Sequence, residues 1–314
     1  MPSSAVRTFA DPDDYTAAVR ATNAEMTIIG RGHFEAKLVH IDLGDLWVRR
    51  YADNLPRIVH SSDEPGYATI SFRTRPGPSL RKNGLEMLPS NIIRCGRADT
   101  YYHQSDGLAH FGSVTLQAED MAAAGAAIVG CNLAPPHEAL NVTPSPTSLD
   151  KLQRLHQAAG ALAEAAPAII AHPEASRGLK QAMIGSMIDC LVSGNLDEDR
   201  SATRQHAAIM RRFHHVIERS AGEPIYIPEL CRAVGASERT LLACCQEHLG
   251  MGPKHYLLLR RMHLLRRALR QSSPGGTTVT ELATRYGFWQ FGRLAVEYKA
   301  LFGETPSATL ARPV

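Results

Sequence analysis

The sequence predicts an α+β protein with a β-rich N-terminal part and an all-α C-terminal domain, in which two helix-turn-helix units are joined by a long helix. Three observations lead to this prediction. Short runs that alternate apolar and polar residues fill residues 33–117, between glycine and proline turns. Two proline-bearing stretches follow, and the apolar spacing after them is helical. A weak internal duplication then occupies residues 226–310. We therefore divide the chain at 1–147, 148–220 and 221–314.

In the β-rich part, Val39, Ile41 and Leu43 alternate with more polar residues, and Gly44-Asp45 fits a hairpin turn before a partner strand over 46–51. Four further strands are expected, at Ala68 to Arg73, Ser90 to Arg94, Asp99 to His103 and Ala109 to Gln117. At least six short strands predict a barrel or a sandwich. An alanine-rich helix over 119–129 closes this part.

Residues 148–220 predict three helices. Ser148 is placed to cap the first, which runs through Leu149 and Leu162; the second covers Pro173 to Val192 and the third 203–219. Their apolar stripes either pack on their own domain or pair two subunits, and the sequence leaves both readings open.

The duplication consists of two similar segments of sequence. Glu229-Leu230, Gly235, Leu249-Gly250 and Pro253 correspond to Glu281-Leu282, Gly287, Phe302-Gly303 and Pro306. The first glycine follows the glutamate by six positions in both copies, and the proline follows the second glycine by three. Each copy therefore predicts a short helix, a glycine turn with positive φ, and a second helix.

The second helix of each copy predicts a reading surface. In the first copy, Leu241, Cys244, Cys245 and Leu249 are spaced to face inward, and Ser237 is placed as the helix cap. In the second copy, the inward set is Phe291, Leu294, Ala295, Tyr298 and Phe302. The outward positions are Glu238, Arg239, Thr240 and Ala243 in the first copy and Trp289, Gln290, Arg293, Val296 and Lys299 in the second. Arginine and glutamine can form paired hydrogen bonds with guanine and adenine edges in the major groove.

The net positive charge of residues 221–314 and the basic helix expected within them favour a polyanion as the binding partner. Residues 221–314 contain 12 Lys and Arg against 7 Asp and Glu, a net charge of +5 in a chain of net charge +3. Pro253 to Arg270 is expected to form one long basic helix that joins the two units. Two recognition helices held in this way could enter major-groove segments about 34 Å apart on one face of a duplex.

These residues carry a family resemblance. Gly287 to Ala295, with Tyr298 to Ser307, resembles the C-terminal signature of AraC/XylS-type transcription regulators, and 237–241 with 249–253 resemble its first half. Two departures are Cys244-Cys245, where the family often has a basic residue and a large aromatic, and Val296, which replaces a frequent arginine.

The resemblance implies a seven-helix DNA-binding domain with two helix-turn-helix units in 221–314, an N-terminal effector-binding or dimerisation domain and promoter regulation; the β-rich part, 1–147, resembles the cupin-like regulatory domain often found there. For 148–220 we expect a helical connector that contains candidate dimerisation helices. We expect a homodimer on promoter DNA, with RNA polymerase and a small-molecule effector as candidate further partners. The DNA-binding residues expected are Ser237, Arg239, Thr240, Lys254, Trp289, Gln290, Arg293 and Lys299.

Other functions have weaker support. A long apolar run and a secretory signal are both missing, so we expect a cytoplasmic protein. The six cysteines lack metal-binding spacing, and His33, His40, His60, His103 and His110 form no HxH pair with a following carboxylate. We therefore expect no enzyme, metal or cofactor. The alternatives are a metal-dependent cupin-type enzyme fused to a DNA-binding domain, and a regulator without a ligand. Polar residues such as Arg49, Tyr51, Tyr102 or His103 inside the barrel would favour a ligand.

Overall fold

The structure, a computed structural model, describes residues 2–19, 22–63, 65–97, 100–196, 201–220, 223–272 and 276–312. Asp99 of one predicted strand lies outside these ranges. The chain divides into two compact units, the first made of residues 1–26, 34–54 and 59–200, and the second of residues 27–33, 55–58 and 201–314. Among the described residues, no helix combines the length and apolar content that a membrane span requires.

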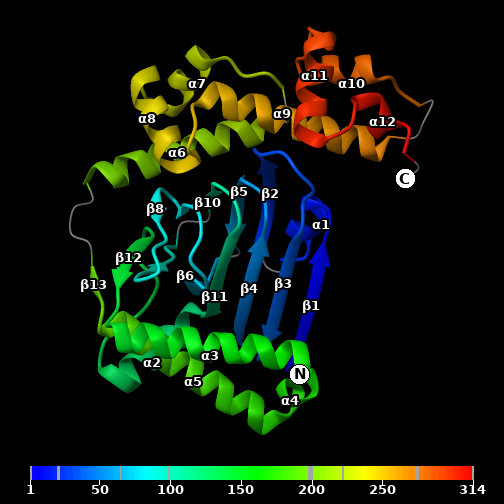
Figure 1. Cartoon of the computed structure of the whole chain (residues 1–314). Coiled ribbons are helices and arrows are strands. Elements are labelled where there is room, and N and C mark those ends of the chain that lie inside the picture. Colours follow the sequence, from blue (N-terminus) through cyan, green and yellow to red (C-terminus); the bar gives the residue numbers. More distant parts are fainter. Residues whose placement is uncertain are drawn as a thin grey trace. The chain divides into compact units, whose positions relative to one another are not determined.

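A large sheet forms the centre of the first unit (Figure 1). Its strands lie in the order β1 (Ser3–Phe9), β3 (Ala36–Asp42), β4 (Leu46–Asp53), β11 (Ala109–Gln117), β6 (Tyr67–Arg73), β9 (Ile92–Arg94), β12 (Leu140–Thr143) and β13 (Asn195–Leu196). The predicted hairpin joins β3 to β4 in antiparallel register, and Gly44 at its tip has φ 93°. The turn therefore uses a conformation that glycine adopts without strain.

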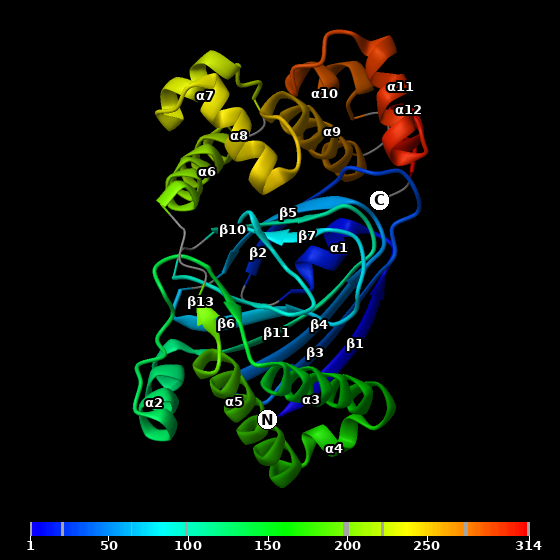
Figure 2. The ribbon, with the colours of Figure 1, turned by 60° about the vertical axis from the view of Figure 1, so that its left-hand side comes forward.

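A smaller sheet contains five strands (Figure 2). Their order is β2 (Thr22–Ile28), β5 (Arg57–Asp63), β10 (Thr100–Ser105), β7 (Leu80–Lys82) and β8 (Leu85–Glu86). Leu80 and Met87 pack with Ile93 and Phe111 of the large sheet. The β-rich prediction is confirmed, but the strands form two sheets and do not close into a barrel.

Helices cover one face of the large sheet (Figure 2). The helices of this unit are α1 (Pro12–Ala17), α2 (Ala118–Val129), α3 (Pro146–Ala165), α4 (Pro167–Ala171) and α5 (Pro173–Val192). Val48, Ile70 and Val114 share a core with Leu152 of α3 and Met187 of α5. The inner stripes of α3 and α5 therefore pack on their own unit.

The expected cap of α3 was wrong by three residues. Ser145, not Ser148, is the cap, and the Ser148 N–H donates to Ser145 Oγ at 3.2 Å. Pro146 is then the first helical residue, where its lack of an N–H costs nothing because that position has no intrahelical acceptor. The proline stretch that predicted a boundary is thus the start of the helix.

The second unit is helical. Its helices are α6 (Ser201–Arg219), α7 (Ile227–Val234), α8 (Glu238–Leu249), α9 (Pro253–Gln271), α10 (Val279–Arg285), α11 (Phe291–Phe302) and α12 (Pro306–Leu310). Gly250 and Gly303 end α8 and α11 with φ 70° and 76°, and Pro253 and Pro306 begin the next helices. The duplication seen in the sequence is therefore a repeat of helix ends and helix starts.

Candidate nucleic-acid interface

The first helix-turn-helix unit consists of α7 and α8. Gly235, with φ 65°, ends α7, and the N–H groups of Gly235 and Ala236 donate to the carbonyls of Arg232 (3.3 Å) and Cys231 (3.1 Å). Ser237 then caps α8, since its Oγ accepts from the Thr240 N–H at 3.1 Å. The turn fixes the direction in which α8 leaves α7.

The inner face of α8 is fully enclosed. Leu241, Cys244, Cys245 and Leu249 are all buried, as their spacing predicted. Burial raises the pKa of the Cys244 thiol to about 11 and the pKa of Cys245 still further. Both thiols are therefore protonated and pack as small apolar groups.

Helix α6 supports the first helix-turn-helix unit, a role that the sequence interpretation missed. Arg212 Nε donates to the Val234 carbonyl at the end of α7 (2.6 Å), and His206 Nδ1 lies 2.5 Å from Glu247 on α8. Phe213 packs on Tyr256 of α9 with ring centroids 6.0 Å apart. The amphipathic pattern of 203–219 was the available signal, but it did not show which helices its apolar face covers.

The second helix-turn-helix unit repeats the geometry with α10 and α11. Gly287 has φ 74°, and the N–H groups of Gly287 and Phe288 donate to the carbonyls of Thr284 and Ala283, both at 2.9 Å. These bonds have the same sequence spacing as those around Gly235. Thr278 caps α10 through the Glu281 N–H (3.1 Å), whereas Gln290 at the start of α11 makes no side-chain cap.

The inner face of α11 is anchored on α12. Leu294 and Tyr298 are buried, and Tyr298 Oη shares a 2.9 Å hydrogen bond with Thr309 Oγ1. Burial raises the pKa of Tyr298 to about 12, so the phenol stays neutral. Phe291 was expected to face inward, but its side chain is 39% exposed. It is the first residue of α11, where the helix has not yet reached the core.

The residues expected to bind DNA lie on the outside of the two units. Seven are exposed and Thr240 is half-buried; the exposed ones are Ser237, Arg239, Lys254, Trp289, Gln290, Arg293 and Lys299. Trp289 is 73% exposed, although tryptophan is usually covered. Arg239 lies on α8, and Arg293 and Lys299 lie on α11. Lys254 lies on α9, and Trp289 and Gln290, expected on the second helix, lie in the turn that precedes α11.

Three of these residues also make contacts within the protein. Ser237 caps α8, Lys254 Nζ lies 3.5 Å from Glu238, and Arg293 Nε donates to Glu297 Oε1 at 2.7 Å. Both ion pairs are mainly exposed, so each contributes less than about 1 kcal/mol to stability. DNA phosphates or bases could therefore replace the carboxylates at low cost.

Several arginines of α9 serve the helical unit itself. Arg261 lies over the Phe288 ring at 5.3 Å, and burial lowers the pKa of its guanidinium. Arg266 lies over the Phe302 ring at 5.1 Å, and buried Arg260 contacts the Ile217 carbonyl at 3.5 Å. Arg261 and Arg266 therefore pack on the second helix-turn-helix unit, and Arg260 packs on α6. Arg267 is half-buried and Arg270 is exposed.

Comparison with known proteins identifies the helical domain. Residues 230–312 match the family described as a helix-turn-helix domain. The probable thc operon regulatory protein of Rhodococcus erythropolis is 36% identical over 132 residues, which are 40% of each chain. Through this domain the chain belongs to the AraC/XylS family.

Two further relatives agree. XylDLEGF operon transcriptional activator 3 of Pseudomonas putida is 35% identical over 101 residues, which are 32% of this chain and 30% of the activator. A probable AraC family regulator from Rhodopseudomonas palustris, of known structure, is 33% identical; the match covers 33% of this chain and 98% of that one, with a TM-score of 0.31. The match spans less than half the length of the two curated relatives named here.

The face of the large sheet that is turned away from α3 and α5 packs against the smaller sheet. It carries some of the polar residues that the sequence interpretation considered as ligand contacts. Arg49 and Tyr51 alternate with Val48, which faces the helices. Arg49 is buried and its Nε donates to His40 Nδ1 at 3.3 Å, while Tyr51 stacks on Phe111 with centroids 4.4 Å apart. On the opposing strand β10, buried His103 packs on Phe111, whereas Tyr102, the residue before it, points to the other face of the smaller sheet. Arg49, Tyr51 and His103 therefore lie between the sheets.

The same interior contains a buried lysine. Lys82 of β7 lies 3.4 Å from Ser71 Oγ of β6 and 4.4 Å from the centre of the Tyr101 ring. Ser71 in turn lies 3.9 Å from Cys95 Sγ, and Thr69 and Thr115 share a 3.0 Å hydrogen bond. The space between the sheets thus holds two cations, Arg49 and Lys82, with several hydroxyl groups.

The histidines considered as metal ligands are dispersed. His33 is exposed, and His40 accepts the Arg49 hydrogen bond. His103 packs on the Phe111 ring and His60 on the Tyr102 ring, with centroids 5.3 and 5.0 Å apart. His110 is half-buried. His40, His60 and His103 thus each have a packing or hydrogen-bonding role.

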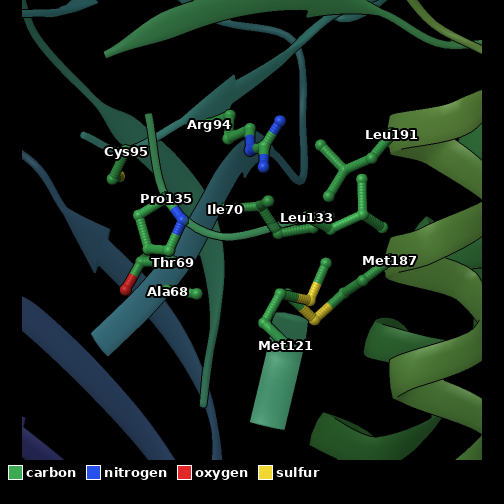
Figure 3. A pocket seen from close by; sticks show the side chains of 10 residues that line it. All are labelled: Ala68, Thr69, Ile70, Arg94, Cys95, Met121, Leu133, Pro135, Met187 and Leu191. Carbon is green, nitrogen blue, oxygen red and sulfur yellow. The ribbon is translucent and has the colours of Figure 1, made fainter. Parts of the chain in front are cut away.

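A small apolar pocket lies on the helix side of the large sheet (Figure 3). Met121 of α2 and Met187 of α5 point toward one another across it, with Arg94 at its edge. Its interior is about the size of one water molecule. In this form the pocket does not accommodate an organic ligand.

Proposed function

We propose that this chain is a sequence-specific DNA-binding transcription regulator. One observation carries the proposal: α8 and α11, the second helices of two helix-turn-helix units, bury their apolar faces and expose Arg239, Arg293 and Lys299. Recognition helices of this type enter the major groove and contact base edges with their exposed side chains. The relatives named as operon regulators support the same activity. We infer no catalytic role and a location with the DNA in the cytoplasm.

The test is selection of DNA by the full chain from a random duplex library, followed by binding to a selected and a scrambled sequence at about 150 mM salt. We expect the selected site to bind about 10³-fold more tightly or better. Equal affinity for both duplexes would refute a sequence-specific regulator, because phosphate contacts alone bind all sequences alike.

We further propose that the first unit binds a small-molecule effector between its two sheets. Ligand sites combine a mostly apolar lining with a few polar groups that contact the ligand. Here Arg49 and Lys82 are both about 95% buried, beside Ser71 and Ser113. The proposed ligand is polar or anionic and would be contacted by these groups.

Native mass spectrometry of the full chain, with and without a small-molecule extract of cells, tests this proposal and also reports whether a homodimer forms. We expect an added mass that Lys82→Met reduces and the surface substitution Lys180→Met does not. A chain that retains no small molecule under any condition would favour the regulator without a ligand. A bound metal ion would favour the cupin-type enzyme instead.

A dimer would place two copies of the helical unit on DNA. The exposed outer sides of α3 and α5 are the surfaces we propose for this pairing, since their inner sides are used in the core. RNA polymerase is the proposed protein partner at a promoter.

A further inference from the structure

We propose that Val296 reads the methyl group of a thymine that lies beside a guanine read by Arg293. This inference rests on the proposed function, and it assigns a specificity-determining role to a residue without polar atoms in its side chain. It predicts a particular chemical feature of the DNA site, a thymine methyl within one or two base pairs of a guanine.

The first step is the exposure of Val296. Its side chain is 71% exposed in the middle of α11, on the helix whose inner face holds Leu294 and Tyr298 in the core. An isolated exposed apolar residue needs no explanation in general. Here, however, Val296 lies three residues from both Arg293 and Lys299, which are also exposed, so the three side chains share one side of α11.

The second step is the spacing of Arg293 and Val296. Residues three apart on a helix are neighbours on its surface, with Cβ atoms about 5–6 Å apart. Base pairs are stacked about 3.4 Å apart along the duplex. Two side chains with this separation therefore reach the same base pair or pairs one or two steps apart.

The third step is the way in which Arg293 is held. Its Nε–H donates to Glu297 Oε1, one helical turn further along α11, at 2.7 Å. The guanidinium has four more N–H donors on its two terminal nitrogens. Glu297 thus orients the side chain through one donor, and the terminal pair remains suited to guanine O6 and N7.

The fourth step is the chemistry that an aliphatic side chain can recognise in the major groove. Thymine alone among the DNA bases presents a methyl group there, and apolar side chains discriminate it by contact. Cations at Arg293 and Lys299 provide charge complementarity to the DNA around the apolar contact. A duplex is therefore the occupant that fits both the apolar residue and its charged neighbours.

The experiment uses the full chain and the DNA site that it selects. Each thymine is replaced in turn by deoxyuridine, which removes only the methyl group. We expect the wild-type protein to lose roughly three- to five-fold in affinity at one thymine near the guanine contacted by Arg293, as expected for one buried methyl group. Val296→Ala should bind the thymine and deoxyuridine versions of that site equally.

Val6→Ala is the matched control, because Val6 is a 38% exposed valine on β1, in the N-terminal compact unit. It should retain the wild-type deoxyuridine profile. An unchanged profile in Val296→Ala would overturn the inference, and an accompanying loss of promoter activation would assign Val296 to a protein contact. Failure to select any sequence would instead overturn the proposed function, so the two failures are distinguishable.

Discussion

The two helix-turn-helix units have the same turn but differ in how their recognition helices are used. In the first helix-turn-helix unit, Ser237 caps α8, and Glu247 of α8 contacts His206 of α6. In the second, Gln290 makes no side-chain cap, and Trp289 and Val296 are more than 70% exposed. The comparison teaches that the turn and the inner face define the repeat, whereas the outer face is free to diverge. We therefore propose that α11 does more of the base reading than α8.

The largest expected difference is in DNA specificity. Arg293→Ala should reduce the ratio of specific to nonspecific binding roughly 5- to 150-fold, which corresponds to the loss of one paired contact to guanine. Arg239→Ala in α8 should reduce it less. Titration of the full chain with selected and scrambled duplexes measures both ratios. If Arg293→Ala weakened both duplexes equally, Arg293 would be a phosphate contact, and the proposed division between the units would be wrong.

The next difference is in the stability of the two turns. Gly235 and Gly287 both have positive φ, so alanine should cost about 1–2 kcal/mol at either position. A Cβ at Gly287 would also lie 2.9 Å from Pro224 and 3.1 Å from Arg261 Nη1, whereas a Cβ at Gly235 would meet no atom within 4 Å. Gly287→Ala should therefore destabilise more in urea unfolding of the full chain. Equal losses would show that the Gly287 surroundings relax freely.

Capping provides a smaller contrast. Ser237→Ala removes the bond to the Thr240 N–H and should cost about 1 kcal/mol of stability. Gln290→Ala removes no capping bond and should change stability by less than about 0.5 kcal/mol, while reducing DNA affinity. Thermal unfolding and DNA titration of both variants separate the two effects. A large stability loss in Gln290→Ala would contradict the asymmetry.

The smallest expected difference is in the response to pH. Burial lowers the folded-state pKa of His248 on α8 below its usual value of about 6.5, with His206 acting in the same direction and Glu247 opposing. As pH falls through about 6.5, the unfolded state therefore binds more protons than the folded state, and the first helix-turn-helix unit should lose stability. Hydrogen exchange of α8 at pH 7.5 and 5.5, corrected for intrinsic rates, checks this. His248→Gln should remove the change in α8, and α11 should show less change in either protein.

The sequence predicted the helical domain better than the β-rich one. Gly235 and Gly287 have the positive φ that their spacing indicated, and Gly250 and Gly303 have it as well, because local backbone geometry determines where glycine is required. The buried pair Cys244-Cys245 was also predicted, from helical periodicity alone. Such signals involve neighbours within a few residues, so they can be read without a structure.

The remaining features depend on partners distant in sequence. β1 was missed because Ser3–Phe9 is mostly exposed and polar, and it is held by pairing with β3 rather than by an apolar pattern. Similarly, Lys82 was not predicted as an interior residue, since its neighbour Ser71 becomes adjacent only when the two sheets pack. The Arg293–Glu297 pair was readable from its spacing of four but was overlooked.

The second compact unit is built from three separate segments of the chain, and this affects the order in which it can fold during synthesis. Segments 27–33 and 55–58 belong to that unit, and His263 Nε2 of α9 donates to the Ile28 carbonyl at 3.0 Å across 235 residues of sequence. At a synthesis rate of about 5–20 residues per second, Ile28 leaves the ribosome roughly 10 to 50 seconds before its partner exists. The second compact unit is therefore completed only after α9 has been synthesised, and a single cut in the gene cannot remove it intact.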